Sequence, residues 1–172
     1  MTRATITTIL FVSTALAATL PASSPAPARP AKGVLFVHLH TGERMRIDPD
    51  AMPSPNRLNR FLRSHADRRY TLMDPRIIQR AALTARRFNK RVVQVVSAFR
   101  SLHVNTRMYA KGRGVARRSR HICGQALDFR VVGLRHETLC RYLRRIRFGG
   151  VGCYKRLRFV HLDVGPVRQW DG

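Results

Sequence analysis

The segment that most constrains the fold is RVVQVVSAF, residues 91–99, in which β-branched residues dominate. Such a run is typical of a buried strand, because branched side chains pack well on a pleated surface. The strand directly follows residues 73–90, where Asp74 can cap a helix, Pro75 suits its first turn and apolar residues recur at helical spacing. Together the two segments predict a helix that leads into a sheet.

Other elements follow from the same two periodicities. They are a β-hairpin at 33–44 with its turn at 41–43, helices at 53–66, 103–110 and 136–146, and strands at 124–132 and 156–165. Residues 149–154 (GGVGCY) predict a tight turn, and the polar stretch 101–120 predicts a functional loop. Helices come mostly before the strands, so we expect an α+β domain with a small antiparallel sheet and helices packed on one side.

The N-terminus predicts export. Residues 1–20 combine a short positive start with an apolar stretch too short to favour a membrane span, and this is typical of a secretory signal peptide. Residues 21–33 are rich in Pro and Ala and predict an extended linker. Residues 34–172 then form one domain. We therefore expect a location in the periplasm or cell envelope, with no stable membrane insertion after signal cleavage.

The charge of the chain predicts a polyanionic partner. The 33 Lys and Arg residues outnumber the 9 Asp and Glu residues, which gives a net charge of +24. The basic residues are spread along the chain without the aromatic pattern of RNA-binding strands, and an exported protein meets little DNA. We therefore expect an acidic wall polymer as the partner and no nucleic acid, although the charge alone also permits a secreted nucleic-acid-binding protein.

The chain has three cysteines, Cys123, Cys140 and Cys153. An odd number in a secreted chain leaves at least one thiol unpaired within the monomer. Cys140 lies on the apolar face of the helix predicted at 136–146, so we expect it to be buried. A disulfide among the three is possible, and the spacing does not identify the pair.

His121, Asp128 and His161 form a candidate metal site. Alternate residues of a strand share a face, so Asp128 and His161 each point away from their apolar neighbours. If the two strands are adjacent, both side chains can converge with His121. Three nitrogen or oxygen ligands with one open position suit catalytic zinc, although the same residues could be ordinary parts of a fold. We expect the other histidines to be surface or packing residues (His38, His40, His65, His103 and His136).

Two segments resemble a known family. SRHICGQALD (119–128) matches the pattern S-x-H-x-x-G-x-A-x-D, and FVHLDVGPVRQW (159–170) matches F-V-H-x-D-x-G-x-x-R-x-W. Both resemble the murein endopeptidase K (YcbK-like) family of zinc peptidases, which is related to the D-Ala-D-Ala metallopeptidases and shares the hedgehog fold. The likeness covers nearly the whole chain after the linker, and the motifs fall in the order and spacing of the family.

The resemblance implies a zinc peptidase that acts on peptidoglycan, and we expect it to be a monomer. It implies one Zn2+ held by His121, Asp128 and His161. It also implies that Arg100 binds a carboxylate of the peptide stem, for which a planar guanidinium is well suited. Ser119 and Asn105 also match the family and are expected to face the substrate or to shape the loop. The implied activity is hydrolysis of an L,D cross-link, with a D,D-carboxypeptidase as the alternative.

Two departures from the family pattern concern the chemistry. Arg158 stands where many related peptidases keep a Glu or Asp, three residues before the last histidine ligand. Asp163 is then the nearest carboxylate, either as the catalytic base or as a residue that orients a ligand, and we favour the orienting role. The departure also permits a non-catalytic peptidoglycan-binding module. Cys123 lies inside the metal motif, where we expect a buried, inert thiol rather than a competing ligand.

Overall fold

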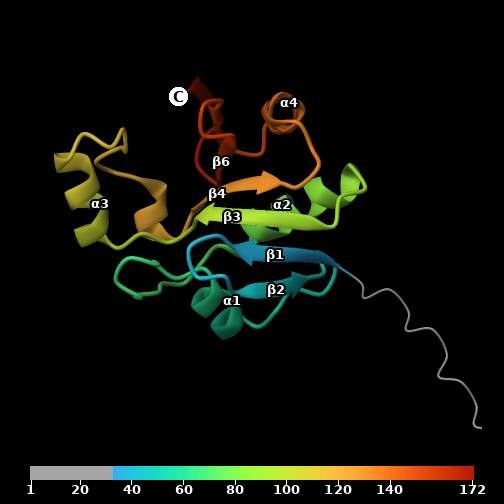
Figure 1. Cartoon of the computed structure of the whole chain (residues 1–172), viewed down its shortest axis with the longest axis horizontal. Coiled ribbons are helices and arrows are strands. Elements are labelled where there is room, and N and C mark those ends of the chain that lie inside the picture. The colour runs from blue at the N-terminus through green and yellow to red at the C-terminus, as the bar shows by residue number, and fades with distance from the viewer. Residues whose placement is uncertain (1–32) are drawn as a thin grey trace, which may run out of the picture. The chain divides into compact units, whose positions relative to one another are not determined.

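Seven strands form one mixed sheet in the computed structural model, which describes residues 33–172 (Figure 1). The strands are β1 Val34–His38, β2 Arg44–Ile47, β3 Val92–Ser97, β4 Ala126–Val131, β5 Gly150–Tyr154, β6 Phe159–Asp163 and β7 Arg168–Asp171. Their order across the sheet is β2-β1-β3-β4-β6-β5-β7. The β1–β3 and β5–β7 pairs are parallel and the other neighbours are antiparallel. The α+β class is confirmed, but the expected small antiparallel sheet is wrong.

The helices begin and end close to the predicted positions. They are α1 Pro55–Phe61, α2 Pro75–Arg87, α3 Leu102–Ala110 and α4 His136–Ile146, with a 3-10 helix, η1, at Arg120–Cys123. Asp74 caps α2 by accepting a hydrogen bond from the Arg76 N–H, and Pro75 occupies the first turn as predicted. The chain between β1 and β3 contains β2, α1 and α2, and this long connection allows β1 and β3 to run parallel.

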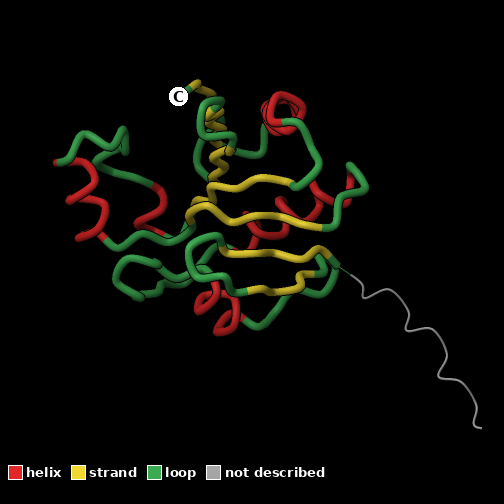
Figure 2. The backbone as a smooth tube through the Cα atoms, in the orientation of Figure 1, coloured by secondary structure: helices red, strands yellow, loops and turns green. Residues whose placement is uncertain are grey.

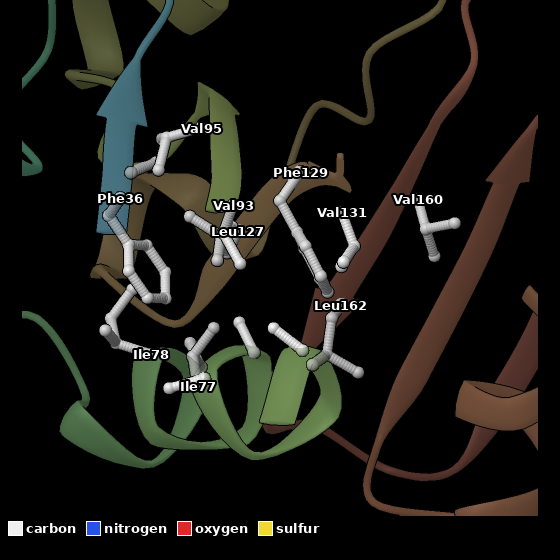
Figure 3. Close-up of a cluster of buried hydrophobic side chains, with 14 of the residues drawn as sticks. Phe36, Ile77, Ile78, Val93, Val95, Leu127, Phe129, Val131, Val160 and Leu162 are labelled. Atoms are coloured by element: carbon white, nitrogen blue, oxygen red, sulfur yellow. The ribbon is translucent and has the colours of Figure 1, made fainter. Parts of the chain in front are cut away.

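One face of the sheet carries the hydrophobic core. The register places Phe36 of β1 beside Val93 of β3, and Leu127 of β4 beside Leu162 of β6, all fully buried. Figure 3 shows these side chains above Ile77 and Ile78 of α2. Helix α4 packs on the same face, because Cys140 of α4 is disulfide-bonded to Cys153, which lies beside the buried Val160. The opposite face is therefore free of α2 and α4.

Two segments differ from their predicted structure. Residues 150–154 of the predicted tight turn form strand β5, and β7 has no counterpart in the prediction. Gly152 has a packing role: a Cβ atom there would lie 2.4 Å from the ring of Trp170 on β7. Strand β7 was missed because three of its four residues are exposed, so its sequence lacks the alternation that marks a half-buried strand.

The long connection between β3 and β4 carries α3, close to the helix predicted at 103–110, and η1, which was not predicted (Figure 2). The predicted signal peptide, residues 1–20, lies outside the described residues, as does nearly all of the predicted linker. No helix within residues 33–172 is long and apolar enough to cross a membrane.

The three cysteines differ in their environment. Cys140 and Cys153 form a disulfide that ties α4 to β5, and Cys140 is buried as predicted. Cys123 is unpaired and exposed, so the expected burial of its thiol is wrong. The reason is that Cys123 ends η1, whose inward-facing residue is His121.

The disulfide is expected to stabilise the fold. Its cysteines are 13 residues apart, and closing a loop of this length in the unfolded chain contributes about 3 kcal/mol to the free energy of unfolding. Replacing both with serine (Cys140→Ser with Cys153→Ser) should lower the free energy of unfolding by about that amount in denaturant titration. Cys123→Ser is the matched control and should leave the midpoint unchanged. An unchanged midpoint in the double variant would contradict a stabilising role.

His38 makes the stability of the fold depend on pH. Its side chain is 1% exposed and packs against Phe61. Burial, assisted by His65 and His40, lowers the pKa of His38 from 6.5 to about 4. Between pH 6.5 and about 4, His38 is therefore protonated in the unfolded chain but neutral in the folded chain. The neutral imidazole is compatible with the fold above pH 6.5, and stability is lost as the pH falls towards 4.

We expect the free energy of unfolding to fall by about 2–3 kcal/mol through this histidine between pH 6.5 and 4. In His38→Asn the pH dependence over this range should become flatter by that amount. His103 is exposed on α3, so His103→Asn is a control that should keep the slope of the wild type. The measurement is chemical denaturation at several pH values; equal slopes for His38→Asn and the wild type would show that His38 is not responsible.

Candidate metal centre

The three predicted ligands come from three elements and meet on the face of the sheet opposite the core. His121 lies in η1, Asp128 on β4 and His161 on β6. Strands β4 and β6 are direct neighbours, and Asp128 lies opposite His161 in their register. All three side chains are buried, with exposed fractions of 3%, 6% and 8%. The sequence predicted that the three side chains converge if their strands are adjacent. The strands are adjacent, and the side chains do converge.

The ligand atoms are spaced as a small metal ion requires. His121 Nε2 lies 3.2 Å from His161 Nδ1 and 3.2 Å from Asp128 Oδ1. His161 Nδ1 lies 2.8 Å from the same carboxylate oxygen. Ligands bound tetrahedrally to zinc at about 2.0–2.1 Å are roughly 3.3 Å apart. The three residues are therefore compatible with a metal ion (His121, Asp128 and His161).

The remaining ring nitrogen of each histidine is held by an oxygen atom of the protein. His121 Nδ1–H donates to the backbone carbonyl of Ala98, and His161 Nε2–H donates to Asp163 Oδ2 at 3.0 Å. These bonds fix the orientation of both rings, and they direct His121 Nε2 and His161 Nδ1 towards Asp128. Metal-binding histidines in proteins are commonly oriented by carbonyl or carboxylate partners of this kind.

The centre concentrates charge in a buried place. Burial lowers the pKa of His161, but hydrogen bonds to Asp128 and Asp163 outweigh it and raise the pKa to about 9. Burial lowers the pKa of His121. For Asp128, burial favours the neutral acid, yet the two histidines hold its pKa well below the usual range. Asp128 is therefore ionised at neutral pH and available as a ligand.

Asp163 faces away from the convergence point. It is fully buried, and its carboxylate accepts hydrogen bonds from Arg168 at 2.6 Å and from the Gly165 N–H at 2.8 Å, besides the bond from His161 Nε2. Burial would raise the pKa of Asp163, but these partners keep it low, so the carboxylate is ionised. Its position on the outer nitrogen of His161 suits a residue that orients the ring.

Arg100 lies beside the centre and is held in place by two polar side chains. Its guanidinium donates to Asn105 Oδ1 at 3.2 Å and to Ser97 Oγ at 3.4 Å, and it lies 4.0 Å from Asp128 Oδ2. Only 8% of Arg100 is exposed. Asn105 is fully buried, and its amide also donates to the carbonyls of Ala116 and Arg117. Asn105 therefore connects Arg100 to the loop after α3.

Ser119 and Arg158 occupy different surroundings. Ser119 lines the cleft, and its Oγ accepts a hydrogen bond from the backbone N–H of His121, which caps η1. Arg158 ends the turn between β5 and β6 with φ of 54°, and its side chain is exposed. It lines a different pocket from the one that contains the three candidate ligands.

The candidate ligands lie in a cleft of about 730 Å3, and only some of the residues that line it were predicted from the sequence. Its walls include Tyr154, Trp170 and Arg168, to which no role was assigned from the sequence. Trp170 Nε1 donates to the Tyr154 hydroxyl at 3.2 Å, and its ring centre lies 5.3 Å from that of His161. The sequence signal that could have identified Arg168 and Trp170 is the final R-x-W of the second motif. These residues lie on β7 and line the cleft.

Comparisons with known proteins agree with this arrangement. The family described as peptidoglycan L,D-endopeptidase MepK matches residues 27–170. Peptidoglycan L,D-endopeptidase MepK of Escherichia coli K12 is 34% identical over 139 residues, which cover 77% of this chain and 76% of the relative. A probable peptidoglycan L,D-endopeptidase MepK of Haemophilus influenzae is 32% identical over 144 residues, which cover 80% and 77% of the two chains. No solved structure matches the chain significantly. With its sequence matched over most of its length, the chain belongs to the MepK family of peptidases.

Proposed function

We propose that this protein is an exported, zinc-dependent endopeptidase that hydrolyses cross-links of peptidoglycan. The observation that carries the proposal is the set of three ligand atoms, buried and mutually 2.8–3.2 Å apart, in a cleft large enough for a peptide. Two histidines and one aspartate are the donor types that zinc takes in hydrolases. When bound, zinc supplies Lewis-acid polarisation of a carbonyl and activation of water.

Arg100 is proposed to bind a free carboxylate of the peptide stem. A guanidinium held by Asn105 and Ser97 needs little reorganisation when it pairs with a carboxylate. Burial lowers the pKa of Arg100 but leaves the group a cation. Ser119 is proposed to keep η1, and with it His121, in place, while Asn105 shapes the loop that borders the cleft.

Asp163 is proposed to be a positioning residue rather than the catalytic base. Both of its oxygens are engaged by Arg168, the Gly165 N–H and the outer nitrogen of His161. A base would instead have to face the bond that is hydrolysed. Among the described residues, Asp128 is the one carboxylate that lines the cleft. The proposed work of Asp163 is therefore to hold His161 with Nδ1 directed at the metal.

The bond and the cellular location complete the proposal. The relatives are named L,D-endopeptidases, so we propose an L,D cross-link as the substrate and rank a D,D-carboxypeptidase second. The Cys140–Cys153 disulfide favours an oxidising compartment such as the periplasm, in accord with a signal peptide at residues 1–20. The family motifs further support a relation to the D-Ala-D-Ala metallopeptidase and hedgehog folds, and we propose a monomer.

Digestion of purified, cross-linked peptidoglycan tests the function. We expect the mature protein to release fragments with loss of one class of cross-link, a chelator to stop the release and added zinc to restore it. His121→Ala and Asp128→Ala should each lower the rate by about a hundredfold or more, because each removes a ligand. Mass spectrometry of the fragments identifies the bond.

The control for these variants is His103→Ala, on the exposed surface of α3, which should keep the full rate. Intact cross-links with wild-type protein still bound to the sacculi would support the alternative of a non-catalytic binding module. Release of terminal D-alanine with cross-links intact would support the D,D-carboxypeptidase.

Asp163→Asn separates the two roles of this carboxylate. As a positioning residue, its loss should weaken zinc binding by about 10–100-fold, measured by competition with a chromogenic chelator, and excess zinc should restore part of the activity. A catalytic base would give the opposite result: unchanged zinc affinity and no turnover at saturating zinc. Thermal unfolding with zinc present shows whether the variant remains folded.

A further inference from the structure

A second pocket of about 590 Å3 lies next to the cleft, on the other side of the β5–β6 turn. The two pockets share this turn: Leu157 lines the cleft, whereas Lys155 and Arg158 line the second pocket. We call this second pocket the basic pocket. Its other walls are the end of β4 and the beginning of α4.

The basic pocket lies at the end of β4 and takes residues from both faces of the sheet: Arg130 and Gln94 share the face of the metal centre, whereas Val131 and α4 belong to the core face. Asp128 and Ser97 line the cleft, and Arg130 and Gln94 on the same two strands line the basic pocket. Asp128 and Arg130 are alternate residues of β4, so they share a face and are separated by roughly 7 Å along the strand. A peptide segment of two or three residues, at about 3.3–3.6 Å per residue, spans this separation.

The basic pocket has an excess of positive charge. Four cations line it (Arg130, Arg135, Lys155 and Arg158), against the single carboxylate of Glu137. Glu137 lies 3.7 Å from Arg135, so this pair is nearly neutral and the other three cations have no carboxylate partner among the residues lining the pocket. Both members of that pair are largely exposed to solvent, which leaves the pair weak.

Arg130 is held at the wall of the basic pocket by the β5–β6 turn. Its Nη2 donates to the Leu157 carbonyl at 2.9 Å, which holds the guanidinium against the β5–β6 turn. Its Nε is shielded and has no hydrogen-bond partner among the described residues. Helix α4 begins at the same pocket, and the cap residue Arg135 makes no side-chain hydrogen bond to the first turn. The first turn already carries the carboxylate of Glu137, which complements the positive end of the helix, so the excess charge of the pocket comes from its side chains.

We propose that the basic pocket is an exosite that binds a free carboxylate of peptidoglycan, on a stem peptide that continues from the bond held in the cleft. This proposal rests on the proposed function, because it takes the substrate to be a peptide polymer with carboxylates. Arg158, which is exposed and lies outside the cleft, then has a role in substrate binding.

Binding to cross-linked sacculi tests the exosite. Lys155→Gln with Arg158→Gln removes two of the cations and keeps the hydrogen bond of Arg130. We expect the double variant to bind sacculi about five- to tenfold more weakly than the wild type at moderate salt, as the loss of two charge-assisted contacts implies. Binding is measured by co-sedimentation with a chelator present, so that no hydrolysis takes place.

The matched control is Arg57→Gln with Arg91→Gln, which removes the same charge from two exposed arginines outside both pockets. The control should bind nearly as the wild type does. If both double variants are weakened equally, only the overall charge matters and the exosite is refuted. Sacculi whose carboxylates have been amidated should bind the wild type and the Lys155/Arg158 variant equally.

Two further outcomes would overturn the proposal. If amidation has no effect while inorganic phosphate abolishes the difference between wild type and variant, the pocket takes a phosphate polymer instead of a carboxylate. If the variant binds sacculi as the wild type does, the pocket has no role in binding. Failure of the proposed function is recognised separately, since a wild type that hydrolyses no cross-link can still show the difference in binding.

Discussion

The arrangement of this protein depends on the antiparallel pairing of β4 with β6. The pairing places Leu127 beside Leu162 on the core face and Asp128 opposite His161 on the other face. A slip of one residue would expose the leucines and bury the two polar side chains among apolar ones. Packing of the core therefore specifies the register, and the same register aligns two candidate ligands.

Polar groups buried at the centre are stabilised by partners of opposite charge. Asp163 pairs with Arg168, and Asp128 lies between Arg100 and two histidines. Unpaired charges at such burial would cost several kcal/mol each, so the paired arrangement is needed for folding as well as for ligand geometry. Each buried candidate ligand therefore has its own polar partner, and these partners come from several elements.

The β5–β6 turn lies between the cleft and the basic pocket. The strands carry His161 and the aromatic wall of the cleft, while the turn directs Lys155 and Arg158 to the basic pocket. Arg158, three residues before His161 in the sequence, is thus a surface cation. Part of the positive charge of the chain thus lies close to the candidate metal centre, in addition to the many arginines on helix surfaces.

The sequence by itself determined the α+β class, the α2–β3 segment and the three candidate ligands, because local periodicity and short motifs carry that information. Only the tertiary structure decided the mixed sheet order, strands β5 and β7, the Cys140–Cys153 pair and the exposure of Cys123. The tertiary structure also decided that Asp163 binds the outer ring nitrogen of His161, Nε2. These features depend on contacts between segments far apart in the chain, or on glycines whose role is set by a neighbour such as Trp170. Local sequence patterns do not specify which distant residues become neighbours. Strand pairing and core packing decide this in the folded chain.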